Sequence, residues 1–340
     1  MTAMYSSNAF DYTNILITGS TGFIGKHLIK ALLEHKMRAN INVLVRKTSD
    51  ISYLKSLGEM RFLYGDLKDK ASLKRSLKGT NIVFHLAGIL GKYGVPEADY
   101  YAINTEGTRN LLEACAENGQ IRQFIYLSSA GVLGPNVKNT NEGYPLNPSN
   151  VYERTKAEAE NIVFDYYREK RVPVTVLRPE SLYGPGDMHL LGLFKAIKKR
   201  MFFLIDGGLS LLHPTYIEDA IQALLICCGN TATIGEAYLI AGERSITVKE
   251  FTGLIVKHLG VKRIDRALSA KTAELIARVF EFSLPILNID PPLTLSRVKF
   301  FTESRSYDTS KAKKDLGLQP FALEEGIKKT IEWYKSKGYL

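Results

Sequence analysis

The sequence predicts an α/β fold: a doubly wound parallel sheet with a smaller C-terminal lobe. Three observations lead to this prediction. Short apolar runs alternate with helix-periodic stretches through the first half of the chain, a glycine-rich turn follows the first apolar run, and the alternation breaks up after Arg178. Because the apolar runs are nearly continuous, helices should cover both faces of the predicted sheet.

The periodicity of the apolar residues places the individual elements. Strands are expected at residues 14–18, 42–45, 60–64, 82–85, 124–128 and 174–178. Helices are expected between them, notably at residues 22–34, 100–118 and 150–170, and an amphipathic helix is expected near residues 323–335. The chain therefore divides into a sheet domain at residues 13–180, with later segments at roughly 210–240 crossing back to it, and a lobe formed mostly by residues 181–340, which includes proline-containing turns at 285–292.

The three cysteines, Cys115, Cys227 and Cys228, stand in no metal-ligand spacing such as C-x-x-C. They are too few for a disulfide framework, so we expect reduced thiols, a cytoplasmic protein and no metal site. Residues 1–13 are polar and lack the apolar core of a signal peptide. No run of 18 apolar residues is present, so we expect no transmembrane segment.

The net charge is +10, from 45 Lys and Arg against 35 Asp and Glu. This excess is consistent with a phosphate-bearing ligand, with nucleic acid or anionic lipid, or with a surface that is merely basic. The basic residues are scattered over 195–200, 311–314 and 328–335 and are not interleaved with aromatic residues. We therefore expect no nucleic-acid partner.

The glycine-rich turn at residues 19–25 has the spacing G-x-x-G-x-x-G between a predicted strand and a predicted helix. Gly19 permits a tight turn, Gly22 lets the backbone approach a pyrophosphate, and Gly25 allows the helix to pack closely on the strand. The N-terminus of that helix presents free N–H groups to phosphates. The context predicts a Rossmann-type dinucleotide site, with Thr21, Phe23 and Ile24 among its contacts.

The end of the second predicted strand bears on the choice between NAD and NADP. An acidic residue there accepts hydrogen bonds from the ribose 2′-OH, but this sequence has Arg46 in that place. A guanidinium suits a 2′-phosphate. We therefore expect NADP(H), contacted by Arg46, Lys47 and Ser49, with NAD(H) as the alternative if Arg46 is only a solvated charge.

Tyr152 and Lys156 stand four residues apart in the predicted helix 150–170, so both side chains can point into one site. A phenol has a reference pKa of about 10. A nearby ammonium and an oxidised nicotinamide would both favour phenolate, as a general base requires. Ser128 and Ser129 end the preceding strand, where a hydroxyl can hydrogen-bond a substrate oxygen. Taken alone, the tyrosine–lysine spacing also fits a surface helix pair.

With these motifs together, the sequence resembles the extended short-chain dehydrogenase/reductases, the NAD-dependent epimerase/dehydratase family. The resemblance covers nearly the whole chain, and its texture is nearest to hopanoid-associated epimerase-like, 3β-hydroxysteroid dehydrogenase-like and dihydroflavonol reductase-like proteins. Besides the glycine turn and the Tyr152–Lys156 pair, the matching motifs are residues 65–67, 85–88, 104–108, 128–129, 177–186 and 310–317.

The resemblance implies a role for each matching residue. Tyr152 is the acid/base, Lys156 holds the nicotinamide ribose and lowers the tyrosine pKa, and Ser129, with Ser128 as the alternative, polarises the substrate. The implied cofactor contacts further include Asp66 and Leu67 at the adenine, Leu86, Ala87 and Gly88 along the cofactor path, Asn104, Ser128, Arg178 and Pro179. His85 and His213 are expected to be packed residues. Relatives also suggest a homodimer formed through helices 100–118 and 150–170.

Departures from the family pattern bear on the substrate. Ala130 and Gly131 stand where dehydratases have an Asp-Glu pair, so dehydration is disfavoured. Leu212 stands where nucleotide-sugar enzymes have an arginine, although Arg297, Lys299 or Arg305 could compensate. Apolar residues at 280–287 and 291–293 fit a pocket for a hydrophobic ketone or alcohol, an interface or core, or, less favoured, a membrane-surface contact.

The main hypothesis is therefore an NAD(P)-dependent oxidoreductase that transfers hydride reversibly at a carbonyl or secondary alcohol. The first alternative is a nucleotide-sugar epimerase that retains its cofactor. The second alternative is a non-catalytic, cofactor-sensing protein on the same fold.

Overall fold

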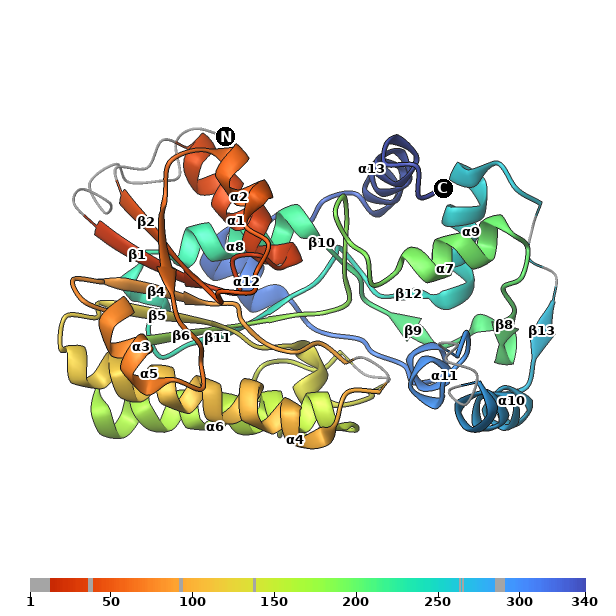
Figure 1. Ribbon diagram of the computed structural model, residues 1–340. Coiled ribbons are helices and arrows are strands. Elements are labelled where there is room, and N and C mark those ends of the chain that lie inside the picture. The colour runs from red at the N-terminus through yellow and green to blue at the C-terminus, as the bar shows by residue number, and fades with distance from the viewer. Residues whose placement is uncertain are drawn as a thin grey trace.

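The computed structural model describes residues 13–35, 39–91, 94–136, 139–262, 264, 266–284 and 291–340. Its centre is a seven-stranded parallel sheet in the order β11-β6-β5-β4-β1-β2-β3 (Figure 1). The strands are β1 (Thr13–Thr18), β2 (Ala39–Val45), β3 (Arg61–Tyr64), β4 (Ile82–His85), β5 (Gln123–Leu127), β6 (Val174–Pro179) and β11 (Ala237–Ile240). The strand order reverses between β1 and β4, and such a reversal opens a crevice at the carboxyl ends of the strands.

Helices cover both faces of this sheet, as a parallel sheet requires. Alternate residues of β1 face opposite sides: Ile15 and Ile17 join one core cluster and Leu16 joins the other. The helices on the first side are α1 (Phe23–Glu34), α2 (Ser52–Leu57), α8 (Ile217–Cys227) and α12 (Ser310–Leu316). Those on the second side are α3 (Lys70–Ser76), α5 (Glu106–Asn118) and α6 (Val151–Lys170).

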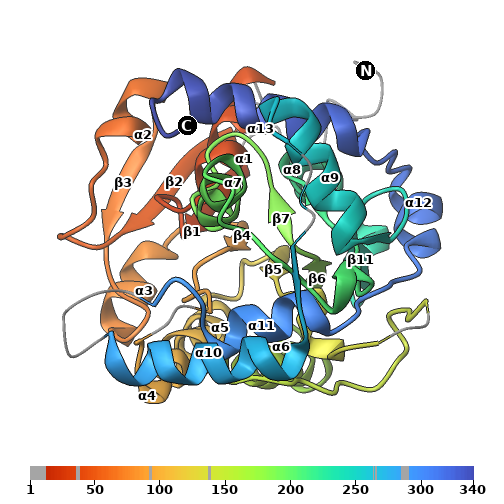
Figure 2. The ribbon, with the colours of Figure 1, turned by 90° about the vertical axis from the view of Figure 1, so that its right-hand side faces the viewer.

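The lobe beside the sheet domain consists of helices and very short strand pairs (Figure 1). Its helices are α7 (Leu191–Lys198), α9 (Val248–Leu259), α10 (Ala270–Ser283), α11 (Leu295–Thr302) and α13 (Leu323–Ser336). Its strand pairs are β8 (Leu204–Ile205) with β13 (Ala267–Leu268), and β9 (Leu211–Leu212) with β12 (Ile246–Thr247). Figure 2 looks onto this lobe and shows α10 and α11 together at one edge, where they pack on each other.

The chain crosses between the two parts several times. β6 leaves the sheet through β7 (Leu182–Tyr183), and β10 (Thr215–Tyr216) pairs with β7 on the return. α8 and β11 then complete the sheet domain, within the expected return at 210–240. A second return, which the sequence did not indicate, brings α12 from the lobe onto β11.

The expected Rossmann-type sheet is confirmed, with small differences in the elements. The helix expected at residues 100–118 begins as α4 (Glu97–Tyr100), continues as one π-helical turn (Tyr101–Thr105) and ends as α5. Most of the proline-containing region expected as turns at 285–292 lies outside the described residues. Among the described residues, no helix is both long and apolar enough to cross a bilayer.

Candidate active site

The glycine turn presses directly on the end of β4. Gly19 has φ +70°, and a Cβ there would lie 2.6 Å from the backbone nitrogen of Ala87. A Cβ on Gly25 would lie 2.3 Å from the carbonyl oxygen of Gly19. The N–H of Gly22, the residue before α1, donates to the Gly19 carbonyl at 3.0 Å. Only glycine fits at Gly19 and Gly25, and the first turn of α1 follows this cradle at once.

The other residues expected near the cofactor surround this cradle. Thr21, Phe23 and Ile24 are partly buried, and the Phe23 ring packs edge-on to His27 with centroids 5.3 Å apart. Leu86 and Ala87, also partly buried, follow β4 and donate their N–H groups to the carbonyl and the hydroxyl of Thr18. These residues thus converge on the junction of β1 and β4.

At the carboxyl end of β2, Arg46 and Lys47 are exposed. The N–H of Ser49 donates to the Arg46 carbonyl at 3.0 Å, which turns the chain back at this point. Asp66 follows β3 and is partly exposed, with one carboxylate oxygen accepting from the Lys68 N–H at 2.9 Å. The side chain of Leu67, in contrast, is buried in the core beneath α5.

Tyr152 lies in the first turn of α6, which Asn150 caps by accepting from the Glu153 N–H at 3.0 Å. Its phenol is hydrogen-bonded to Ser129 at the end of β5. Burial raises the pKa of Tyr152 to about 12, and the bond to Ser129 opposes that rise. The two residues predicted to act on the substrate are therefore in contact.

Lys156 lies one turn further along α6 and is buried. Its Nζ donates to the Leu127 carbonyl at 2.5 Å and stands 4.2 Å from the centre of the Tyr126 ring. Burial lowers the pKa of Lys156 to about 7, although the charge of Glu160 opposes this. The amine is thus held by a carbonyl and an aromatic face.

Arg178 is part of a buried ion pair. Its guanidinium contacts both carboxylate oxygens of Glu160, and it also donates to the Glu142 carbonyl at 3.1 Å. Pro179, the next residue, is buried beside Ile240 of β11. The side chain of Arg178 is committed to the interior, so the expectation that it contacts the cofactor finds no support in this arrangement.

Asn104 stands in the π-helical turn and connects three segments. Its amide accepts from the Ile89 N–H at 2.7 Å and donates to the Ile89 carbonyl and to the Thr155 hydroxyl, each at 3.1 Å. Gly88 is close by, because a Cβ there would lie 3.1 Å from Asn104 Oδ1. The widened turn thereby ties the loop after β4 to α6.

His85 and His213 are packed in the interior, as expected. His85 is fully buried between the hydroxyls of Thr18 and Thr108, at 2.7 and 2.9 Å. Burial lowers the pKa of His85 to about 3, so its ring is neutral. His213 is buried and bonded to the Gly242 carbonyl at 3.0 Å and to the Tyr307 N–H at 3.3 Å.

The arrangement suits a dinucleotide for two reasons. The cradle around Gly19 and Gly25 excludes any side chain, which leaves backbone N–H groups to meet a pyrophosphate. Ser128 Oγ is buried and has no hydrogen-bond partner within the described part of the chain. Buried hydroxyls are normally satisfied, so Ser128 is available to a bound group. Among the described residues, no cluster of side chains could hold a metal ion.

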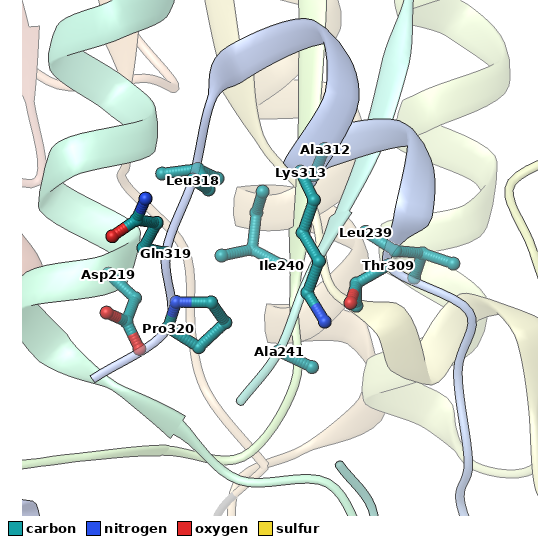
Figure 3. Close-up of a pocket in the computed structure, with 10 residues that line it drawn as sticks. All are labelled: Asp219, Leu239, Ile240, Ala241, Thr309, Ala312, Lys313, Leu318, Gln319 and Pro320. Atoms are coloured by element: carbon teal, nitrogen blue, oxygen red, sulfur yellow. The ribbon is translucent and has the colours of Figure 1, made fainter. Parts of the chain in front are cut away.

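Two hollows lie outside this cradle. One of about 270 Å³ is in the lobe, and its lining residues are Ile205, Asp206, Leu209, Ser210, Phe301, Thr302 and Ser304. The other, shown in Figure 3, lies between α8, β11 and α12 and holds about 10 Å³, room for a single water. Asp219 lines it with a carboxylate oxygen that has no partner in the described residues.

The charged groups near Tyr152 could not be predicted from the sequence. Glu153 pairs with Arg305 at 2.8 Å, and both are buried. Glu180 is also buried, and its charge and that of Glu153 both raise the pKa of Tyr152. From the sequence, Arg305 is expected only as a substitute for the arginine that Leu212 replaces, and Leu212 is buried in the core. No local pattern links residues so far apart in the chain.

The sequence model of the NAD dependent epimerase/dehydratase family matches residues 15–241. The chain belongs to this family. It is 30% identical to the decarboxylating sterol-4-alpha-carboxylate 3-dehydrogenase of Saccharomyces cerevisiae, over 94% of this chain and 97% of that protein. It is 29% identical to 3beta-hydroxysteroid-dehydrogenase/decarboxylase isoform 2 of Arabidopsis thaliana, over 93% of this chain, and spans 61% of that protein's length.

Among solved structures, UDP-glucuronic acid 4-epimerase from Bacillus cereus, crystallised with UDP-glucuronic acid and NAD, superposes with a TM-score of 0.77. The two are 24% identical, and the match covers 96% of this chain and 100% of that one, which shows a shared fold. The resemblance expected from the motifs is confirmed. The family consists of NAD-dependent enzymes, so the chain is assigned to the oxidoreductases and epimerases.

Proposed function

We propose that this protein is an NADP(H)-dependent dehydrogenase or reductase that interconverts a secondary alcohol and a carbonyl. The observation that carries the proposal is the contact between the partly buried side chains of Tyr152 and Ser129, with Lys156 one helical turn away. A phenol, a hydroxyl and an amine in this order supply a proton carrier, a donor to the substrate oxygen and a positive charge. Ser129 follows the carboxyl end of β5, and Tyr152 and Lys156 lie near the start of α6.

Each residue has a distinct task. A bound dinucleotide would supply the hydride acceptor or donor. Ser129 donates a hydrogen bond to the substrate oxygen, and Tyr152 takes the hydroxyl proton during oxidation or returns it during reduction. The pKa of about 12 at Tyr152 means that the phenol needs nearby positive charge before it can act as a base. Lys156 provides that charge when protonated and, in the same proposal, holds the nicotinamide ribose.

The preference for NADP(H) rests on Arg46 and Lys47, which are exposed where the second strand ends. A guanidinium can pair with a 2′-phosphate in two parallel hydrogen bonds, but it offers no acceptor to a free hydroxyl. Ser49 and the turn it forms with Arg46 complete the proposed contact. Replacing Arg46 with Ser should weaken NADP binding about tenfold or more, with little change for NAD, in fluorescence titrations with the reduced cofactors.

The proposed substrate is a largely apolar molecule that carries a secondary alcohol or ketone, as a sterol does. Two relatives act on 3-hydroxysterols or sterol carboxylates according to their names. Arg305, which contacts the residue after Tyr152, is already paired with Glu153 and Glu303 and therefore cannot readily take a diphosphate. Arg297 donates to the carbonyls of Pro291 and Pro292. These contacts disfavour a nucleotide sugar.

An epimerase that retains its cofactor is the second candidate, because the same residues would serve it and the Bacillus cereus epimerase shares the fold. The dehydrogenase and epimerase activities can be distinguished in one assay: a dehydrogenase changes the absorbance of the reduced cofactor in proportion to product, whereas an epimerase converts substrate with no net change in that absorbance.

A homodimer through α5 and α6, which pack side by side, is also proposed.

The direct test compares Tyr152→Phe with wild type. Purified protein is assayed with NADP⁺ and NAD⁺ against 3β-hydroxysteroids, 3β-hydroxysteroid 4α-carboxylates and UDP-hexoses. The variant keeps the ring but loses the proton carrier, so turnover of the accepted substrate should fall about 10²–10⁴-fold with unchanged cofactor binding. Tyr64→Phe, at an exposed tyrosine, is the matched control. Turnover by Tyr152→Phe within a factor of a few of wild type would refute the proposal.

A further inference from the structure

The segment that crosses from the lobe back to the sheet, residues 303–309, contacts the chain neighbours of two catalytic residues, Ala130 after Ser129 and Glu153 after Tyr152. The Arg305 N–H donates to the Leu211 carbonyl of β9 at 2.8 Å, which fixes the segment to the lobe. On its other side, the Tyr307 hydroxyl donates to the Ala130 carbonyl at 3.2 Å, directly after Ser129. We call residues 303–309 the crossing segment.

Arg305 is the charged centre of this segment. Its guanidinium is 2.8 Å from Glu153, the residue after Tyr152, and 3.5 Å from Glu303. Its side chain is 9% exposed and that of Glu153 is 6% exposed, so this pair lies inside the protein. Burial alone would lower the pKa of Arg305, but the charges of Glu180 and Glu153 raise it above its ordinary value. The guanidinium therefore stays protonated.

Glu180 completes the cluster from the end of β6. It accepts from the Ser181 hydroxyl at 2.7 Å. Burial raises the pKa of Glu180, and the charge of Arg305 opposes that rise. Arg305 thus pairs directly with the buried Glu153, and its charge also acts on the buried Glu180. Without that cation, one of the two carboxylates would have to take up a proton.

Tyr152 lies against this cluster. The groups that act on its phenol are Ser129 beyond β5, Glu153 on α6, Glu180 after β6 and Tyr100 on α4. The carboxylates among them repel a phenolate, and Arg305 is the cation that compensates both. A buried charge pair with good geometry also fixes the position of the residues that carry it.

We propose that Arg305 is a positioning residue for the catalytic site: it neutralises Glu153 and Glu180 together and thereby holds Tyr152 and Ser129 in place from the lobe. Ser304, the residue before Arg305, lines the lobe hollow. The crossing segment therefore borders this hollow through Ser304 and contacts the residue after Tyr152 through Arg305. This inference rests on the role proposed for Tyr152, but its test requires neither substrate nor cofactor.

The first measurement is thermal unfolding of wild type, Arg305→Met, Arg305→Lys and the double variant Arg305→Met/Glu153→Gln between about pH 5 and about pH 8. In Arg305→Met, the carboxylate pKa values in the folded state rise above their unfolded values of about 4.5. The variant should therefore lose stability as the pH rises, with a Tm deficit growing to the order of 5 °C. The double variant, which removes one anion, should recover much of that loss, and Arg305→Lys should recover part of it.

The second measurement is the NMR spectrum of protein labelled with ¹³C at the tyrosine Cζ, in which Tyr152→Phe identifies the Tyr152 signal. Arg305→Met should shift that signal, and Arg305→Lys should restore it towards the wild-type position. Arg244→Met, which breaks an exposed pair with Glu250, is the control and should leave it unchanged. A Tm deficit that does not depend on pH, or an unshifted Tyr152 signal in Arg305→Met, would overturn the proposal.

If Arg305→Met does not fold, Arg305→Lys and Glu153→Gln carry the same test, because each weakens the pair without leaving both carboxylates unpaired. Failure of the proposed enzymatic function would leave these results intact, since it would show only as absent turnover. Failure of this inference would leave turnover by wild type intact.

Discussion

Helix α6 carries two buried charged sites on its inward face, and they are built differently. At Lys156, the amine meets a backbone carbonyl and the Tyr126 ring, and burial lowers its pKa to about 7. One turn later, Glu160 is paired with Arg178, and both side chains are at most 5% exposed. The Lys156 amine is therefore a buried group that stays reactive, whereas the Glu160 carboxylate is neutralised by its ion pair with Arg178.

The physical reason lies in the cost of burying charge. A matched pair recovers much of its lost hydration through mutual attraction and hydrogen bonds. A lone amine does not, so its neutral form is favoured and its pKa falls. Because Glu160 is held by Arg178, it is not free to pair with Lys156. The structural pair therefore keeps the lysine responsive to a ligand.

The largest effect on activity is expected for Lys156→Met. If the amine serves chemistry, turnover should fall about 10²–10⁴-fold. The free energy of unfolding near pH 7 should stay equal or increase, because a poorly matched polar group is replaced by an apolar one of similar length. Steady-state kinetics with the substrate found above and urea unfolding measure the two effects. A variant that is strongly destabilised would show that Lys156 belongs to the fold.

Arg178→Met examines the opposite site. It leaves Glu160 buried without its cation, so the free energy of unfolding should decrease by about 3–5 kcal/mol in urea titrations. Adding Glu160→Gln should return part of that loss. Arg244→Met, at an exposed pair, should cost less than about 1 kcal/mol. If the buried and the exposed variants cost the same, the distinction between the two sites of α6 fails.

Gly25→Ala tests a third kind of site, which is built from backbone groups and carries no side-chain charge. The added Cβ would lie 2.3 Å from the Gly19 carbonyl oxygen, so the turn must move at a cost of about 1–3 kcal/mol. Binding of NADPH should weaken at least about tenfold in fluorescence titrations. Gly253→Ala in α9 is the control, because its Cβ meets nothing within 4 Å. Unchanged cofactor binding in Gly25→Ala would place the dinucleotide elsewhere.

The smallest expected effect concerns His85, whose charge is suppressed by burial. Its pKa is lowered to about 3 in the folded protein from an ordinary value of 6.5. Between these values the unfolded chain binds the proton and the folded chain does not, so stability falls as the pH drops below about 6.5. This group contributes at most about 1.4 kcal/mol per pH unit. His85→Gln should flatten the acid limb of Tm against pH, and an unchanged slope would contradict the neutral, packed histidine.

Much of the sheet domain could be predicted from local pattern. The strands at β1, β4 and β6 read as apolar runs because helices bury both of their faces. The glycine turn could be predicted because close backbone contacts require glycine at positions 19 and 25. The lobe offered no such signal, since its strands are two residues long and its core forms between distant segments.

The candidate site divides in the same way. The pair Tyr152 and Lys156 could be predicted from its spacing together with the strand before it, and the choice of Ser129 over Ser128 came from the resemblance to the family. Arg305 and Glu180 could not, because their meeting with Glu153 depends on the path of the crossing segment. The role expected for Arg178 was assigned from a motif, and only the fold shows that Glu160 occupies its guanidinium.

The most direct test is a crystal structure of the protein with NADP⁺. We predict that the pyrophosphate lies against the turn at Gly19–Gly25 and that the Tyr152 oxygen and the Lys156 nitrogen face the nicotinamide ribose. The phenol should lie within about 4 Å of the position where a substrate oxygen would meet the nicotinamide ring. A nicotinamide bound away from Tyr152, with Ser129 still hydrogen-bonded to the phenol and no ligand near either, would contradict it.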